Sequence, residues 1–421
     1  MRRSIEVFLG EQTSPVATIH YDNQGSRQSS AFEYRDEWLK KTERFALAPT
    51  LPLVKGPQFH KKETHGSVFH SIVADTEPDG WGRRVTQRDH AKQTQRARAA
   101  GQTFKPDVLN MLDHLLYVDD FGRLGALRLK DESGRFQRDA GDGQRRAPPL
   151  IELGSLLRAS QAVETSTETA EDLAYLRGQG TSLGGLRPKC NVLDADGHLC
   201  IGKFPSVADE RPVTKAEVLA LNLARLAGIN AAQSTLIRTD DGPVALIRRF
   251  DRSATGRLLY ASAATMLDVD PKSGAEGTYT QIVDSIRQVG LQAQQDIEEL
   301  WRRIAFSILI NNVDDHLLNH GFLHVRAGQW ALSPAFDINP FPDRARELKT
   351  WISEECGPEA TVDALMSVTS YFGLSKTKAG EILAQVDAGV SRWRTEGKAL
   401  GMSPNELDMF ADAFEHDQRS S

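Results

Sequence analysis

Residues 4–35 alternate between apolar and polar positions, which is the pattern of strands with one buried face. Asn23-Gln24-Gly25 interrupts the alternation with residues that favour turns. We therefore expect a few antiparallel strands at this end of the chain. Residues 67–100 have a helical pattern with a basic run, and we interpret that run as a solvated helix face rather than a nucleic-acid contact.

The middle of the chain changes character twice. Residues 131–149 are polar, rich in Gly and Arg, and end in two prolines, so they predict a linker. Short helices are expected next, followed by a strand-rich block over residues 182–250. Inside that block, residues 217–227 place three leucines on one face before Gly228, which predicts a helix and its end.

From Asp296 onward the pattern is mainly helical. Asp296 with Glu299 three residues later predicts the N-cap of a helix. The following apolar positions recur at helical spacing and should face the core: Leu300, Ile304 and Ile308.

Composition narrows the class of protein. The 421 residues suffice for two or three domains, and a net charge of -6 implies no bulk attraction to nucleic acid or membrane. The three cysteines match neither a zinc site nor a CxxC motif, and their odd number argues against a disulfide framework. No apolar run is long enough for a membrane span, and the amino terminus does not resemble a signal peptide, so we expect a cytoplasmic protein.

The strongest chemical signal is a cluster of carboxylates and amides that follows an apolar helix. Residues 311–319 read NNVDDHLLN, and residues 333–337 read SPAFD after two short strand-like runs. Phosphoryl transfer needs a carboxylate that deprotonates the attacking hydroxyl, and oxygen ligands that hold Mg²⁺ against the nucleotide. The spacing predicts Asp314 as the base and Asn319 and Asp337 as the Mg²⁺ ligands.

A second group of residues could hold the phosphates. Lys203 ends a strand-like run that follows the turn residues 194–197, and Glu217 on the next helix could form an ion pair with it. Upstream, residues 178–189 read GQGTSLGGLRPK, a glycine-dense loop whose backbone N–H groups could cradle phosphates. The order of these elements is that of a bilobal kinase.

Together these motifs resemble the HipA family of bacterial kinase toxins. Residues 181–189 resemble its phosphate-binding loop, residues 249–252 (RFDR) its hinge segment, residues 312–319 its catalytic loop and residues 333–337 its metal-binding segment. Residues 33–39 and 51–53 resemble the small β-rich subdomain that precedes the kinase core.

The resemblance implies an α+β, bilobal, protein-kinase-like fold related to phosphatidylinositol kinases, with an added N-terminal β-rich subdomain. The expected divisions are 1–130 (β-rich subdomain with helices), 131–150 (linker), 151–250 (ATP-binding lobe) and 251–421 (helical lobe). It also implies ATP and Mg²⁺ as cofactors and a Ser- or Thr-bearing protein substrate, with aminoacyl-tRNA synthetases among the family's targets. A HipB-like DNA-binding antitoxin is the implied partner, so DNA would be contacted only through it, and Ser182 would be autophosphorylated.

The predicted site residues fall into three groups. The catalytic group is Asp314, Lys203 and His316. The nucleotide-binding group is Ser182, Gly184, Gly185, Lys189, Lys203, Glu217, Arg249 and Phe250. The metal group is Asn319 and Asp337. One departure from the family is Leu318, because many members carry a lysine immediately before the catalytic-loop asparagine; His324 and Arg326 are possible substitutes.

Three alternatives remain at this stage. The first is a small-molecule or lipid kinase on the same fold, and the second is a non-catalytic subunit of a DNA-binding repressor complex. The third concerns the histidines at 316, 320 and 324, whose spacing could suit zinc. The triplet Asp120-Phe121-Gly122 spells a kinase metal motif but comes too early in the chain, so we assign it no chemistry.

Overall fold

The chain folds into two compact units, each built from separate stretches of sequence. The computed structural model describes residues 2–25, 27–60, 66–78, 80–103, 108–137, 147–177, 185–270 and 277–419. Unit 1 contains Met1–Ala208 and Arg238–Ala261, and unit 2 contains Asp209–Ile237 and Ser262–Ser421. The chain therefore passes between the units after residue 208, within strand β8 (Ser234–Thr239) and within strand β12 (Tyr260–Ser262).

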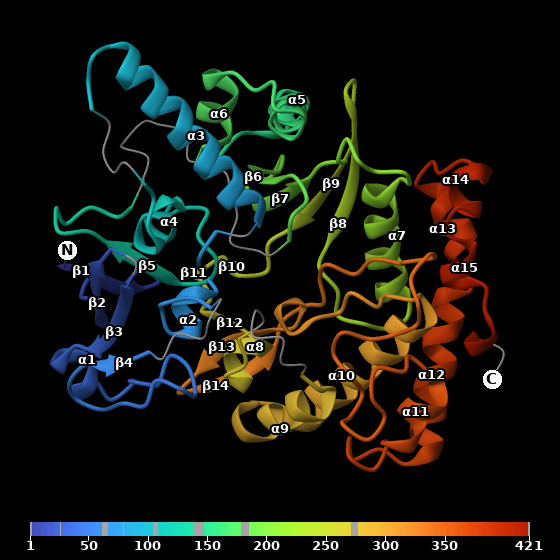
Figure 1. Cartoon of the computed structure of the whole chain (residues 1–421). Coiled ribbons are helices and arrows are strands. Elements are labelled where there is room, and N and C mark those ends of the chain that lie inside the picture. Colours follow the sequence, from blue (N-terminus) through green and yellow to red (C-terminus); the bar gives the residue numbers. More distant parts are fainter. Residues whose placement is uncertain are drawn as a thin grey trace. The chain divides into compact units, whose positions relative to one another are not determined.

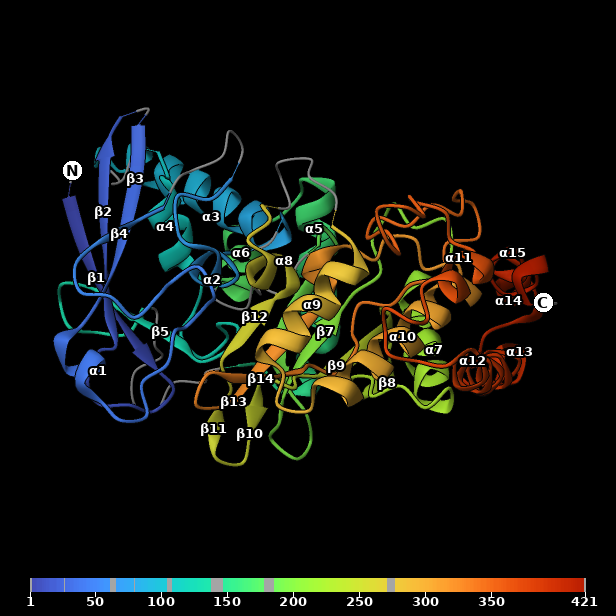
Figure 2. The ribbon, with the colours of Figure 1, turned by 90° about the horizontal axis from the view of Figure 1, so that it is seen from below.

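The amino-terminal part of unit 1 is a five-stranded sheet with the strand order β4-β3-β2-β1-β5. The first three strands form successive antiparallel hairpins and lie side by side in Figures 1 and 2. This confirms the strands predicted from alternation, whose apolar positions are buried. The bounds are β1 Arg2–Leu9, β2 Ala17–Gln24, β3 Arg27–Tyr34, β4 Gln58–Phe59 and β5 Leu127–Lys130.

Unit 1 also contains helices, several of which contact one another. On α3 the basic run begins with arginines that contact the protein itself: Arg83 pairs with Glu77 at 2.7 Å, and Arg88 donates two hydrogen bonds to Glu168 at 2.8 and 2.7 Å. The bounds are α1 Asp36–Lys40, α2 Ser71–Ala74, α3 Gly80–Ala99, α4 Met111–Tyr117, a 3₁₀ turn Leu150–Glu152, α5 Leu153–Thr165 and α6 Ala170–Leu176.

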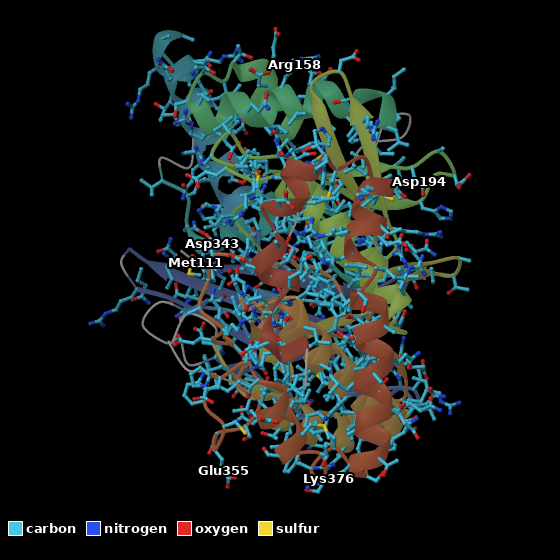
Figure 3. All side chains as sticks on the ribbon, turned by 90° about the vertical axis from the view of Figure 1, so that its right-hand side faces the viewer. Met111, Arg158, Asp194, Asp343, Glu355 and Lys376 are labelled. Carbon is cyan, nitrogen blue, oxygen red and sulfur yellow. The ribbon has the colours of Figure 1, made fainter. Side chains whose placement is uncertain are left out.

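A second sheet of unit 1 contains the antiparallel strands β6 (Lys189–Leu193), β7 (Leu199–Lys203) and β9 (Gly242–Arg248). The predicted turn joins β6 to β7, and Asp194 in Figure 3 marks where it begins. Gly197 has a φ of +82°. This conformation favours glycine, which explains why glycine is the last residue of the turn. Two two-residue strands, β10 (Arg252–Ser253) and β11 (Gly256–Arg257), form a small hairpin that begins at the last residue of the RFDR segment.

Unit 2 is mainly helical, and α10 packs against α9 and α12 within it. The predicted apolar stripe of α10 is completely buried. The bounds are α7 Val213–Leu226, α8 Ala263–Leu267, α9 Tyr279–Val289, α10 Ala293–Leu309, a 3₁₀ turn Leu317–Asn319, β13 Gly321–Arg326, β14 Gln329–Leu332, α11 Val362–Ser367, α12 Lys376–Val390, α13 Trp393–Ala399, α14 Pro404–Asp408, α15 Ala411–Phe414 and a 3₁₀ turn Asp417–Arg419.

The predicted N-cap of α10 was wrong, because the helix begins at Ala293 with Gln292 as its N-cap. Asp296 lies inside the helix, and its carboxylate accepts a hydrogen bond from the backbone N–H of Leu332 at 3.2 Å. The predicted end of α7 is confirmed, with Gly228 at a φ of +80°. Among the described residues, no helix combines the length and apolar character needed to cross a bilayer.

Candidate active site

The loop that follows α10 begins at Asn311, which has a φ of +51°. Asparagine tolerates this left-handed conformation better than most residues. Its side-chain amide donates to the carbonyl of Phe341 at 2.5 Å and to that of Arg344 at 3.2 Å. Asn311 therefore turns the chain sharply and fixes the start of the loop to the segment around 341–344.

Asp314 and Asn319 both lie in this loop and are connected by a hydrogen bond. The amide nitrogen of Asn319 donates to the backbone carbonyl of Asp314 at 3.2 Å, and a 3₁₀ turn closes the loop between them. The Asp314 side chain is 34% exposed, so its carboxylate can meet a reactant from solvent. With its nitrogen engaged, Asn319 has its side-chain oxygen available as a ligand atom.

Asp337 joins the same loop through Asn339. The backbone N–H of Asn339 donates to the side-chain oxygen of buried Asn312 at 3.2 Å, and its side-chain amide donates to Asp337 Oδ1 at 3.3 Å. Asp337 has a φ of +55°, which turns the backbone immediately after the SPAF residues. Unit 2 thus brings together three predicted site residues, Asp314, Asn319 and Asp337, from two segments of chain.

Asp315 anchors the loop, although sequence reasoning gave it no role. Its buried carboxylate accepts a hydrogen bond from the Tyr279 hydroxyl at 2.5 Å and lies 3.1 Å from the Nε2 atom of His320. Burial opposes ionisation of Asp315, but His320 and the Tyr279 hydrogen bond hold its pKa below the ordinary value. The signal in the sequence for a role of Asp315 was its position next to Asp314, because the side chains of neighbouring loop residues can point in different directions and have different roles.

The three loop histidines have different surroundings. His316 has a buried Nδ1 atom without a hydrogen bond among the described residues, whereas His320 faces Asp315. His324 lies against Trp330, and its Nε2 atom accepts a hydrogen bond from the backbone N–H of Gly328 at 3.2 Å. Burial lowers the pKa of His324 to about 4. No group of potential metal ligands in the described part of the chain contains these histidines, so the zinc alternative gains no support. The catalytic role of His316 stays a prediction.

In unit 1, Lys189 and Lys203 stand directly opposite each other on β6 and β7. Residues in such register place their side chains on the same face of the sheet. Lys189 is buried, and Gly185, with a φ of +91°, passes so close that a Cβ atom there would lie 3.0 Å from the Lys189 ammonium. Ammonium groups are donors that suit an anion such as phosphate. Contact of these two lysines with a nucleotide stays a prediction. Ser182 and Gly184 lie outside the described residues.

Glu217 is buried on α7, in unit 2, while Lys203 belongs to unit 1. The ion pair predicted between them stays a prediction. The structure locates each residue on the kind of element expected, a helix for Glu217 and the end of a strand for Lys203.

Arg249 occupies the interior of unit 1. Its guanidinium donates to both carboxylate oxygens of Asp251, to the side-chain oxygen of Asn191 at 2.9 Å, and to the carbonyls of Gly122 and Arg123 at 2.6 and 3.1 Å. These bonds tie the β6–β7–β9 sheet to the segment that precedes β5. Sequence reasoning missed this structural role, and contact of Arg249 or Phe250 with a nucleotide stays a prediction.

Asp120 of the Asp-Phe-Gly triplet belongs to the same arginine-rich interior. Its buried carboxylate pairs with Arg128 at 2.7 Å and with Arg257 at 3.0 Å. Carboxylates buried among guanidinium groups stabilise structure through paired charges. These contacts indicate a structural role for Asp120, in agreement with our assignment of no chemistry to the triplet.

Two protein-family models match the sequence. The HipA-like C-terminal domain matches residues 181–393, which include every predicted catalytic and metal residue, and the HipA N-terminal domain matches residues 5–104. The first match alone covers half of the chain.

Individual relatives are more distant. The "Putative kinase Y4mE" of Sinorhizobium fredii is 25% identical over 325 residues, covering 73% of this chain and 71% of that protein. The "Putative kinase Y4dM" of the same organism is 29% identical over 140 residues, covering 30% of this chain and only 34% of that protein.

A solved structure matches along nearly the whole chain. The HipA of Shewanella oneidensis, determined with HipB and operator DNA, has a TM-score of 0.67 and 14% identity, covering 97% of this chain and 95% of that one. At this identity the likeness establishes the fold alone. The predicted mixed α+β kinase fold with a β-rich amino-terminal region is confirmed.

Proposed function

The chain belongs to the HipA family, and from this premise we propose that it is an ATP- and Mg²⁺-dependent kinase that phosphorylates serine or threonine hydroxyl groups of a protein. The single observation that carries the proposal is the linkage in unit 2 of Asp314, Asn319 and Asp337. Asn319 is bonded to Asp314, and Asn339 connects Asp337 to the same loop through Asn312.

In the proposed reaction Asp314 accepts the proton of the substrate hydroxyl. The hydroxyl oxygen forms a bond to the γ-phosphorus of ATP, the bond from that phosphorus to the β-γ bridging oxygen breaks, and ADP leaves with the electron pair. The partial exposure of Asp314 suits this role, because the base must reach a hydroxyl on another molecule.

The residues present fit Mg²⁺, which prefers oxygen ligands. Asp337 offers a carboxylate and Asn319 an amide oxygen, and these two residues would hold the ion. When bound, Mg²⁺ neutralises charge on the phosphates. Lys189 and Lys203 are our candidates for binding ATP phosphates through their ammonium groups, and the family resemblance adds Ser182, Gly184 and Gly185 to them.

The substrate and partner form the finer part of the proposal. We infer a cellular protein target that is related to translation, autophosphorylation at Ser182, and a HipB-like antitoxin partner through which any contact with DNA would be made. These inferences rest on family membership. The cytoplasm is the proposed location.

Intact-mass measurement before and after incubation with Mg·ATP tests the proposal without a known substrate. We expect the wild-type protein to gain one phosphate and Asp314→Ala to gain none. Asp363→Ala, which removes an exposed carboxylate of the same unit, should behave like the wild type and controls for charge. Ser182→Ala then tests the position of the phosphate.

The outcomes separate the candidate functions. A wild-type protein that gains no phosphate and shows no thermal shift with Mg·ATP would contradict kinase activity and favour the non-catalytic subunit. Transfer of labelled phosphate to metabolites but to no protein would instead identify a small-molecule kinase.

A further inference from the structure

The catalytic loop lacks a cation that the family resemblance would place in it. Leu318 stands immediately before Asn319, where many family members carry lysine. A positive charge at this place offsets the negative charge of the phosphoryl group during its transfer, and such electrostatic stabilisation is a large part of catalysis. The loop sequence alone therefore leaves the transferred group without a partner.

The structure supplies a cation from another segment of unit 2. The ammonium of Lys349 forms an ion pair with Asp314 Oδ1, and the guanidinium of Arg344 lies 3.6 Å from the same oxygen. That oxygen accepts no well-aligned hydrogen bond among the described residues, so the contact with Lys349 is one between charges. Lys349 thus stands beside the proposed base.

Lys349 is held in place by its backbone. Its N–H donates to the carbonyl of Val313 at 3.3 Å, next to Asp314 in the chain. The segment that leads to it is fixed by Asn311, which binds the carbonyls of Phe341 and Arg344. The cation is therefore carried on a segment that is bonded to the catalytic loop at two places.

We propose that Lys349 replaces the catalytic-loop lysine as the positioning cation for phosphoryl transfer. It orients the carboxylate of Asp314 toward the substrate hydroxyl and places a positive charge beside the γ-phosphoryl group. Its side chain is 56% exposed, and exposed ion pairs contribute little to stability, so a stabilising role does not explain its position. The inference rests on the proposed kinase function.

The same contact has an opposite interpretation that is open to test. A lysine paired with the base could occupy the carboxylate and inhibit the enzyme until a substrate displaces it. Removing Lys349 would then raise the rate of phosphoryl transfer, whereas our proposal requires the rate to fall. The direction of the change therefore decides between the two.

The test follows the incorporation of phosphate from Mg·ATP into the protein itself, measured by intact mass against time, for five proteins: wild type, Lys349→Ala, Lys349→Arg, the double variant Lys349→Ala/Leu318→Lys, and Lys398→Ala. We expect Lys349→Ala to lower the rate constant of phosphate incorporation at saturating ATP roughly 10²-fold with little change in the half-saturation constant for ATP, and Lys349→Arg to retain part of the rate. The double variant should recover much of the loss, because it returns the charge to the loop. Lys398 is an exposed lysine on α13 and its removal should change neither constant.

Each outcome has one meaning. A wild-type rate no higher than that of Asp314→Ala removes the proposed function and this inference with it. A wild-type rate above that level, together with an unchanged or increased rate in Lys349→Ala, overturns the inference alone. An equal fall in Lys349→Ala and in the double variant also overturns it, provided that the Mg·ATP-induced thermal shift of both variants matches the wild type.

Discussion

Arg249 donates hydrogen bonds to Asp251 Oδ1 at 2.8 Å and to Asp251 Oδ2 at 2.6 Å in the interior of unit 1. Arg252 pairs with the same carboxylate at 2.6 Å, and the N–H of Gly125 donates to it at 2.7 Å. Burial opposes ionisation of Asp251, but the two guanidinium groups hold its pKa well below the ordinary value of 3.8. One carboxylate is therefore the counter-charge shared by the buried Arg249 and the partly buried Arg252.

Removal of this carboxylate should destabilise the protein strongly. We expect Asp251→Ala to lower the free energy of unfolding by about 3–5 kcal/mol, because the buried Arg249 and the partly buried Arg252 lose their counter-charge. Urea unfolding at neutral pH measures the change. Asp363→Ala, at an exposed carboxylate, is the matched control, and an equal effect of both substitutions would contradict the structural role.

Stability measured at acid pH should reveal the contribution of the Asp251 carboxylate. A carboxylate whose folded-state pKa is depressed contributes its stability above the unfolded-state pKa and loses it as the pH falls below that value. The contribution of Asp251 is thus complete above about pH 5 and declines as the pH falls through the ordinary Asp value of 3.8 and below. The difference in stability between wild type and Asp251→Ala should shrink in that range.

Tyr279, the first residue of α9, contacts the catalytic loop through Asp315. Tyr279→Phe removes the hydroxyl that donates to the buried carboxylate of Asp315 at 2.5 Å. We expect a loss of about 2 kcal/mol in the free energy of unfolding and a lower rate of phosphoryl transfer, because the loop loses an anchor.

Tyr371 provides a matched control for this substitution. Its hydroxyl donates to Asp284 at 2.6 Å, but this pair is exposed. Tyr371→Phe should change stability by no more than about 0.5 kcal/mol. Similar losses for the two phenylalanine variants, measured by urea unfolding, would contradict the anchoring role of Tyr279.

Asp337→Asn separates the charge of the proposed metal ligand from its conformation. Asparagine tolerates the left-handed backbone at this position and keeps a side-chain oxygen for the bond from Asn339. We therefore expect a melting temperature close to that of the wild type, with phosphoryl transfer reduced at least about 10²-fold. Titration of the rate with Mg²⁺ should show weaker binding of the ion, and full activity at ordinary Mg²⁺ concentrations would exclude Asp337 as a ligand.

Short-range patterns predicted the elements well. The alternation over residues 4–35, the turn at 194–197 and the end of α7 at Gly228 all depend on local preferences that the sequence displays directly. The start of α10 was mistaken because Asp296 satisfies the local pattern of a cap, yet its carboxylate binds the N–H of Leu332 on a distant strand. A contact of that kind has no local signature.

The candidate site follows the same division. Motif spacing was enough to place Asp314, Asn319 and Asp337 near one another, because a single loop and the hairpin after it carry all three. The bridging by Asn339 and the approach of Lys349 depend on how the segment 339–349 returns to the loop. The spacing of the motifs does not predict how this segment returns to the loop. Leu318 indicated that the loop lacks a cation, but not where another cation lies.

The division of unit 1 between two stretches of chain has a consequence for biosynthesis and for dissection of the protein. Strand β9 pairs with β7 but follows it in the sequence only after α7 and β8. Unit 1 therefore cannot be completed until residue 261 has left the ribosome. A fragment that stops at residue 208 would expose the unpaired edge of β7 and would lack Arg249 and Asp251. Truncation at that point should yield an aggregating polypeptide rather than a folded unit.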